Sequence, residues 1–216
     1  TTRKKNAFQN LITAFEEGSI DILVGTQMVS KGLDFENVGL VGVLSADSLW
    51  NRPDFRAFER AYQMLTQVSG RAGRKGRRGR VLIQTFRVDH PVLEYVINHS
   101  YEGMYQHQIS ERQQFAYPPY TRIMQFKLMH TDAKFTKEAA VYFAGLLRER
   151  FGKRILGPEE PTIPRIRGRF IRQIFLKMEG TLSLKQSRKA VWECIDLLEG
   201  HESYRKAKFQ IDVDPL

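Results

Sequence analysis

Hydrophobic positions recur at two different spacings along residues 1–88. Apolar residues three or four apart predict a helix over 2–17, with Thr2 as its N-cap, and a second helix over 55–67. Short apolar runs predict buried strands at 21–25, 38–43 and 80–84. Because these strands alternate with helices, we expect a mostly parallel sheet that is covered by helices.

Residues 89–116 carry the pattern of one or two connecting helices. The pair His90-Pro91 is a helix start signal, since proline is favoured at the first helical position. The stretch ends before Tyr117-Pro118-Pro119-Tyr120, where two prolines prevent a helix from continuing. We expect a domain boundary here, and a rigid linker is favoured over a polyproline ligand for a partner protein.

A second domain is predicted over 117–216. Its patterns predict strands at 123–129, 171–178 and 209–213, helices at 136–151 and 187–198, an extended stretch at 157–167 and a turn at Gly168. The resulting βαββαβ order is that of the ferredoxin-like fold. The expected fold class is therefore α/β over residues 1–88, followed by an α+β domain.

The composition indicates a basic protein, whose charge favours a polyanion as its partner. Among 216 residues, 34 Lys and Arg stand against 24 Asp and Glu, for a net charge of +10. Nucleic acid is the obvious polyanion, although many basic domains bind none. One cysteine, Cys194, excludes a disulfide framework and a cysteine-built zinc site, and the five histidines show no metal-ligand spacing.

Two further absences bear on where the protein acts. No apolar run approaches the ~20 residues that cross a bilayer, and no charged-then-apolar start marks a secretory signal. We therefore expect a cytoplasmic protein. Because the chain starts at Thr1 without an initiator methionine, we also expect it to be a piece of a longer protein.

The strongest chemical signal is the string Gln67-Val68-Ser69-Gly70-Arg71-Ala72-Gly73-Arg74. Its two arginines are three residues apart near the end of a predicted helix, so both guanidinium groups can face one side. The guanidinium fork matches phosphate oxygens, and an arginine at a γ-phosphate neutralises charge that develops during phosphoryl transfer. The alternative is a basic helix end that complements its own dipole, followed by a solvated loop.

A second string, Gly25-Thr26-Gln27-Met28-Val29-Ser30-Lys31-Gly32-Leu33-Asp34-Phe35, directly follows the strand predicted at 21–25. Thr26 and Gln27 offer hydroxyl and amide groups that suit a nucleic-acid backbone. Gly32 allows a close turn, and the Asp34 carboxylate can accept a ribose hydroxyl or orient an arginine. Ligands of parallel sheets bind at the carboxyl ends of strands, where we expect both strings to lie.

In this order and spacing, the two strings resemble motifs V and VI of the superfamily 2 helicases. Between them, Leu40-Val41-Gly42-Val43-Leu44-Ser45-Ala46-Asp47 and Arg52-Pro53-Asp54-Phe55-Arg56-Ala57-Phe58-Glu59-Arg60 are similar to the replication-restart helicases of the primosome. Later strings that fit the same family are Glu111-Arg112, Tyr117-Pro118-Pro119-Tyr120 and Asp212-Val213-Asp214-Pro215.

The resemblance implies a fold and an activity. Residues 1–88 would be the C-terminal part of a RecA-like helicase lobe 2, and 117–216 a ribosomal-protein-like domain that binds DNA forks. The intact protein would be an ATP-driven 3′→5′ DNA helicase that binds stalled forks and D-loops and rebuilds the replisome. It would act in the bacterial cytoplasm, at the nucleoid, with single-strand-binding protein and the other primosome restart proteins as partners.

The same resemblance assigns roles to residues of the two strings. Arg74 would be the arginine finger, Arg71 the second arginine on the γ-phosphate, and Gln67 the residue that completes the motif. The remaining positions would lie at the nucleotide interface or at the DNA strand: Gly32 and Asp34 at the nucleotide, Thr26 and Gln27 at the DNA.

Parts of the family pattern are absent from this sequence. It has no G-x-x-x-x-G-K-[ST] phosphate loop and no D-E-x-H-like acid pair to hold Mg²⁺. ATP and Mg²⁺ would therefore need the missing lobe 1, and the zinc of the intact family protein would not be bound by this chain. We expect no ATPase or unwinding activity from this chain alone. Two alternatives stay open: a piece of another superfamily 2 translocase, and a nucleic-acid-binding module without enzymatic activity.

A second basic cluster surrounds Gly168 and consists of Arg165, Arg167, Arg169 and Arg172. Alternation along a strand puts Arg165 and Arg167 on one face. We expect the tip of a basic hairpin that enters a DNA groove or lies on phosphates. The alternative is a surface hairpin whose charge prevents pairing with another sheet edge.

Overall fold

The computed structural model describes residues 7–26, 38–73, 79–180 and 182–215. The chain forms two compact units, Thr1–Gln106 and His107–Leu216. Their boundary lies inside α6 (Tyr101–Gln114), within the segment to which the sequence assigns connecting helices. The three-part division into 1–88, 89–116 and 117–216 stays a prediction.

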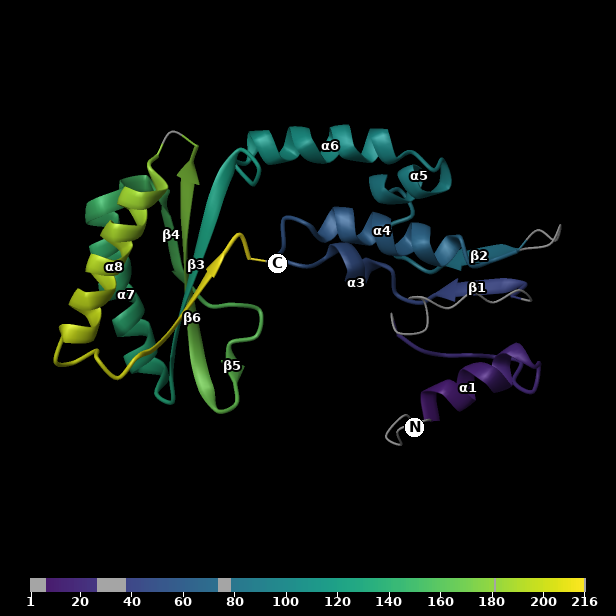
Figure 1. Ribbon diagram of the computed structural model, residues 1–216, viewed down its shortest axis with the longest axis horizontal. Helices are drawn as coiled ribbons and strands as arrows, with labels where there is room; N and C mark the ends of the chain where they lie inside the picture. The colour runs from purple at the N-terminus through teal and green to yellow at the C-terminus, as the bar shows by residue number, and fades with distance from the viewer. Residues whose placement is uncertain (1–6, 27–37, 74–78, 181, 216) are drawn as a thin grey trace. The chain divides into compact units, whose positions relative to one another are not determined.

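The first unit contains a parallel pair of strands and the helices around it (Figure 1). Strand β1 pairs with β2, with Leu40 opposite Arg80 and Val43 opposite Ile83. The elements that precede α6 are, in chain order, α1 (Ala7–Glu16), β1 (Leu40–Val43), α3 (Asp47–Trp50), α4 (Ala57–Ser69), β2 (Arg80–Ile83) and α5 (Pro91–Ile97).

The core of the first unit is built on one stripe of α4. Ala61, Tyr62 and Leu65 follow the helical period and are buried. They belong to one cluster with side chains of α3, α5 and α6, namely Trp50, Val92, Leu93, Val96 and Met104. Helix α5 begins as expected at Pro91, and the His90 side chain accepts a hydrogen bond from the Val92 N–H at 3.3 Å.

The strand predicted at 21–25 is wrong. Residues 22–25 have no regular structure, and Ile22 and Val24 are 77% and 82% exposed. A strand needs a neighbour to receive its backbone hydrogen bonds, and among the described residues β1 pairs only with β2 in this unit. This apolar run therefore has no strand partner among the described residues, and its Ile22 and Val24 side chains stay exposed.

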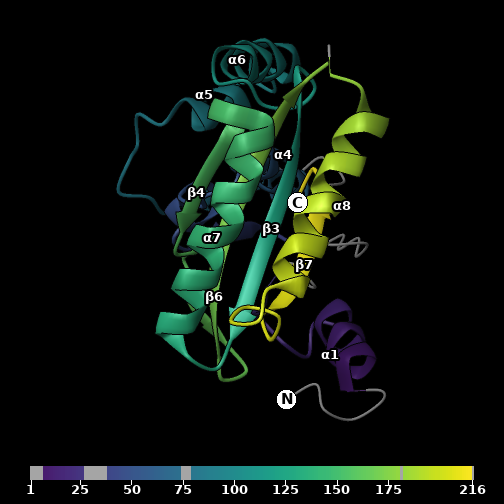
Figure 2. The ribbon, with the colours of Figure 1, turned by 90° about the vertical axis from the view of Figure 1, so that its left-hand side faces the viewer.

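The second unit is an antiparallel sheet with two helices on one face (Figure 2). Its main strand order is β4-β6-β3-β7, and the short β5 pairs with β6. This confirms the βαββαβ order predicted from the sequence. The elements are β3 (Thr121–His130), α7 (Ala133–Phe151), the 3₁₀ turn η1 (Gly152–Arg154), β4 (Ile155–Glu159), β5 (Arg165–Ile166), β6 (Arg169–Glu179), α8 (Leu184–Gly200) and β7 (Lys208–Val213).

Alternation along the two central strands builds the core of the second unit. Side chains two residues apart share a sheet face, and one face of β3 and β6 packs on α7 and α8. The buried members from the strands are Met124, Phe126, Leu128, Ile174, Leu176 and Met178. Cys194 of α8 lies in the same core, where burial raises the pKa of its thiol. The thiol therefore stays protonated and is a core residue rather than a nucleophile.

We expect the Phe143→Ala substitution to destabilise the second unit by about 3–5 kcal/mol, because it leaves a cavity in the core. Phe143 is fully buried, with its ring edge-on to Phe126 and Phe209 at 5.6 and 5.0 Å. Hydrogen exchange of the β3 and β6 amides measures the stability of this unit. Val141→Ala, on the same helix at a side chain that is 52% exposed, is the matched control. Equal protection in the two variants would contradict the assigned core.

Candidate nucleotide and nucleic-acid interface

The string that ends in Arg74 begins on the last turn of α4. Gln67 is exposed there, and the helix ends at Ser69. Gly70 and Arg71 donate backbone hydrogen bonds to Thr66 and Val68, both at 3.0 Å, so the chain leaves the helix in tight turns. Arg71 is consequently held directly after the helix end, and its side chain is half-buried.

Backbone contacts attach this segment to the start of both strands. The Gly73 N–H donates to the Val38 carbonyl at 3.1 Å, and the Arg80 N–H donates to the Gly39 carbonyl at 2.9 Å. Gly73 has a φ of +79°, which favours glycine. A Cβ on Gly79 would lie 2.2 Å from the Gly73 nitrogen, so the two backbones approach closely only because residue 79 is glycine.

This placement corrects one expectation. The segment 70–73 lies at the amino ends of β1 and β2, whereas the sequence placed it at carboxyl ends. The reason is the parallel pairing, since a chain that connects two parallel strands must return to the edge where both begin. Helix α4 makes that return, so the residues that follow it reach the amino edge.

Several candidate residues of the two strings lie outside the described residues: Gln27, Gly32, Asp34 and Arg74. Thr26 is described and is exposed at the end of a segment without regular structure. The roles assigned to all of these residues, and to Gln67 and Arg71, stay predictions.

The carboxyl ends of the strands carry a different group, which the sequence assigned no role. Asp47, the first residue of α3, is buried and accepts hydrogen bonds from the Thr85 hydroxyl at 3.0 Å and the Phe86 N–H at 3.1 Å. Burial raises the pKa of Asp47, but these hydrogen bonds outweigh it and the net shift is downward. The carboxylate thus joins the segments that follow β1 and β2.

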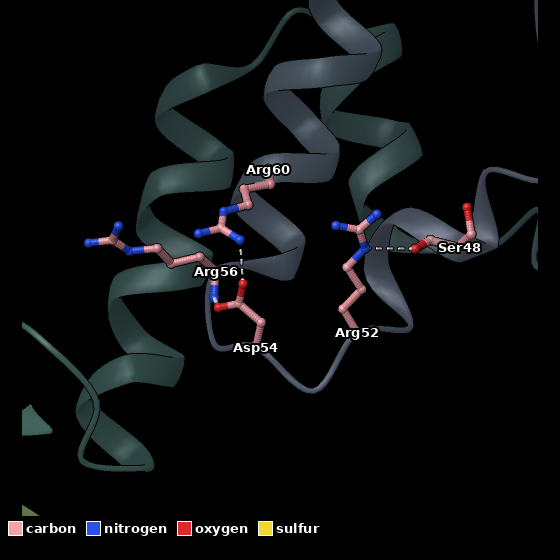
Figure 3. Close-up of polar contacts among 5 residues, drawn as sticks. All are labelled: Ser48, Arg52, Asp54, Arg56 and Arg60. Atoms are coloured by element: carbon pink, nitrogen blue, oxygen red, sulfur yellow. Dashed lines mark hydrogen bonds and ion pairs between the residues drawn. The ribbon is translucent and has the colours of Figure 1, made fainter. Parts of the chain in front are cut away.

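Three arginines lie around the start of α4 (Figure 3). The Asp54 carboxylate accepts from the Arg60 guanidinium at 2.6 Å and from the Arg56 backbone N–H at 2.9 Å. The Asp54 carbonyl accepts from the Ala57 N–H at 2.9 Å. The first α-helical hydrogen bond runs from the Arg60 N–H to the Arg56 carbonyl at 2.9 Å, so the helix starts at 57 rather than at the predicted 55. Arg52 donates through Nε to the Ser48 carbonyl at 3.3 Å. The Asp54 carboxylate therefore connects the start of α4 to the Arg60 side chain, while Arg52 is held separately by the Ser48 carbonyl.

The predicted basic hairpin exists in the second unit. β5 and β6 pair with Arg165 opposite Phe170 and Ile166 opposite Arg169. Arg167 and Gly168 form a two-residue turn with φ values of +47° and +80°, as hairpin turns require. The alternation expected from 165 to 167 is wrong, because the strand ends at Ile166 and Arg167 lies in the turn.

The four hairpin arginines have different surroundings. The Arg165 guanidinium lies 4.9 Å from the centroid of the Phe170 ring, and Arg167 is exposed. Arg172 forms an ion pair with Glu160 and is only 21% exposed. The hairpin therefore exposes Arg165 and Arg167, whereas Arg169 and Arg172 are half-buried.

Within the described residues, the structure shows neither a metal-binding cluster nor a helix that could cross a membrane. No group of three or more His, Cys, Asp or Glu among the described residues could hold a metal ion. No helix within residues 7–26, 38–73, 79–180 and 182–215 is long and apolar enough to cross a membrane.

Two protein families match the two parts of the chain. The helicase conserved C-terminal domain matches residues 2–76, and the primosomal protein N C-terminal domain matches residues 113–216. The replication restart protein PriA of Bacillus subtilis is 42% identical over 195 residues, which are 89% of this chain and 24% of that protein. The chain belongs to the PriA family.

Other PriA proteins give the same result. PriA of Synechocystis is 41% identical over 179 residues, which cover 82% of this chain and 22% of that protein. PriA of Chlamydia pneumoniae is 33% identical over 220 residues, which cover 100% of this chain and 28% of that protein. The chain thus spans about a quarter of the length of these relatives. The expected family and fold class, part of a RecA-like lobe 2 followed by the PriA C-terminal domain, are confirmed.

We expect the stability of the first unit to fall in acid through Asp47. A pKa that is lowered in the folded state contributes stability above the unfolded pKa of about 3.9 and loses it as the pH falls through the folded pKa. Asp47→Asn should therefore weaken thermal stability at neutral pH and flatten its decline between about pH 5 and pH 2. Melting curves followed by circular dichroism across this range make the comparison. Parallel pH profiles for the two chains would contradict the assigned role of Asp47.

Proposed function

We propose that the chain is part of an ATP-driven 3′→5′ DNA helicase that binds stalled forks and D-loops and restarts replication. The observation that carries the proposal is the string at the end of α4 in a chain of the PriA family. Its small residues and backbone hydrogen bonds hold Arg71 directly after the helix, where a phosphate could approach it. The relatives are named as replication restart proteins, which supports this activity over that of another superfamily 2 translocase.

In the proposed mechanism this chain completes an ATP site that the other lobe mainly builds. Arg74 acts as the arginine finger, and Arg71 contacts the γ-phosphate with it. Gln67, one turn earlier, completes the motif, while Gly32 and Asp34 line the nucleotide interface. ATP with Mg²⁺ supplies the phosphoryl group that is transferred to water. The sequence lacks the phosphate loop and the acid pair, so these residues fit a contributor to the site and not its main holder.

The DNA contacts are proposed in both units. Thr26 and Gln27 contact the DNA strand or couple it to the ATP site. In the second unit, the proposed DNA contacts are Arg165, Arg167 and Arg169 at the hairpin and Arg172, which also forms an ion pair with Glu160. A net charge of +10 over the chain favours attraction to phosphates.

The proposed partners and location follow from the same activity. Single-strand-binding protein and the primosome restart proteins would act with the intact protein at the fork. The place of action would be the bacterial cytoplasm at the nucleoid. The chain by itself would bind DNA without hydrolysing ATP.

We expect Arg74→Ala in the intact protein to reduce the rate of DNA-stimulated ATP hydrolysis by about 10³–10⁵, because an arginine finger contributes that much to phosphoryl transfer. A steady-state assay with a forked DNA measures this rate. The control is Arg78→Ala, which removes the same charge four residues away. Its rate of ATP hydrolysis should stay within a few-fold of the wild-type rate. An Arg74→Ala enzyme with normal turnover would contradict the proposal, as would ATPase activity of the isolated chain above that of its Arg71→Ala, Arg74→Ala variant.

We expect the hairpin arginines to carry part of the affinity for duplex and forked DNA. Each neutralised phosphate contributes about −0.9 to the log–log salt slope on duplex DNA. Replacing Arg165, Arg167 and Arg169 with Gln should reduce the slope by about 2.7 in fluorescence anisotropy titrations across ~50–200 mM salt. The matched control replaces Lys185, Arg188 and Lys189 on α8, which are all exposed. Equal reductions of the salt slope in the two variants would contradict the proposed hairpin contacts, because only the overall charge would then matter.

A further inference from the structure

A hollow on the second unit combines aromatic walls with a cationic rim. Its volume is about 510 Å³, which is in the range of small-molecule sites. It lies between the exposed side of α7 and the turn that connects α8 to β7. The residues that line it are Lys134, Lys137, Glu138, Val141, Tyr142 and Tyr204.

The two tyrosine rings are held in place by their neighbours. The centroids of Tyr142 and Tyr204 are 5.3 Å apart, and the His201 ring lies 4.6 Å from the first and 4.7 Å from the second. His201 is fixed in turn, because its Nδ1 accepts the Ser203 N–H at 3.2 Å. Both tyrosines also pack against the core. The aromatic wall therefore exists before any ligand arrives.

The rim of the hollow is positive. Lys134 and Lys137 project from the first turns of α7 and line the hollow directly. Lys134 has a carboxylate partner, Glu138, but only at 4.0 Å and with the lysine side chain 86% exposed. Such a pair contributes little and is readily exchanged. Near Tyr204, Arg205 and Lys206 of the turn and Lys208 at the start of β7 are exposed cations, against one exposed carboxylate of the turn, Glu202.

The side chains of Phe170, His130 and Phe135 lie between the basic hairpin and this hollow. The Arg165 guanidinium lies over Phe170, and Phe170 pairs across the sheet with His130. The His130 ring lies 4.1 Å from Phe135, and Phe135 lies 6.1 Å from Tyr204. The hairpin, the end of β3, the start of α7 and the start of β7 all lie at the same end of the unit (Figure 2).

We propose that Tyr142, Tyr204, Lys134 and Lys137 form a subsite for a nucleotide of single-stranded DNA. The chemistry is complementary, because a base offers a flat face to the tyrosines and its phosphate offers charge to the lysines. Bases inside a duplex are stacked on each other and cannot reach the rings, so the subsite selects single strands. The inference rests on the proposed DNA-binding function, and it places the single-stranded arm of a fork beside the hairpin that would contact the duplex.

The test compares the binding of a labelled oligothymidylate and of a duplex of equal length to the 216-residue chain. Replacing both tyrosines, Tyr142→Leu with Tyr204→Leu, should weaken binding of the single strand about fivefold to a hundredfold, as expected for the loss of base stacking. Binding of the duplex should change by less than about twofold, since the subsite does not take paired bases. Tyr142→Phe with Tyr204→Phe keeps both rings and should restore the affinity.

A second pair of variants keeps the test valid if the tyrosine substitutions disturb the core. Lys134→Gln with Lys137→Gln leaves the aromatic cluster unchanged and should reduce the salt slope on single strands by about 1.4, at ~0.7 for each phosphate. The control is Lys185→Gln with Lys189→Gln, at the opposite end of α8 from His201. This control should keep the wild-type slope.

The outcomes separate the subsite from the broader function. A wild-type chain that binds neither DNA would overturn the proposed DNA-binding function and the subsite with it. A wild-type chain that binds both DNAs, with the lysine pair behaving like its α8 control, would overturn only the subsite. Equal loss of single-strand and duplex binding in the folded tyrosine variant would also overturn it.

Discussion

The parallel pairing of β1 with β2 determines where each functional group of the first unit lies. Parallel strands begin at the same edge of a sheet, so the chain between them must cross back along the sheet before the second strand starts. Helix α4 makes that crossing. Its first turn and Asp54 lie at one end of the crossing, and Arg71 lies at the other end. The close backbone approach of Gly73 and Gly79 then attaches the end of the crossing to the strands.

The parallel pairing also places two kinds of polar group at opposite ends of the strands. At the carboxyl ends of the strands, Asp47 accepts hydrogen bonds from Thr85 and Phe86, so it joins the two strand ends. At the amino ends, backbone hydrogen bonds from Gly70, Arg71 and Gly73 attach the string to the end of α4 and to Val38. These backbone hydrogen bonds hold the segment directly after the helix.

Most elements of the second unit could be predicted from the sequence, because their patterns are local. Alternation with period two identified β3, β6 and β7, and the helical period identified α7 and α8, each to within a few residues. The strand expected at 21–25 failed because an apolar run becomes a strand only when a neighbour accepts its hydrogen bonds. The expected start of α4 was two residues early, because Asp54 accepts hydrogen bonds from the Arg56 and Ala57 N–H groups before the helix begins.

The sequence by itself determined the family, the order of the elements and the identity of the candidate phosphate-binding arginines, since each of these is a property of neighbouring residues. Only the tertiary structure decided that Arg71 lies at the amino ends of the strands, because that depends on the direction in which β1 and β2 pair. It also decided that Tyr142 and Tyr204 form one wall with Lys134 and Lys137. These residues come from α7 and from the turn after α8, and only the packing of both helices on one face of the sheet brings them together.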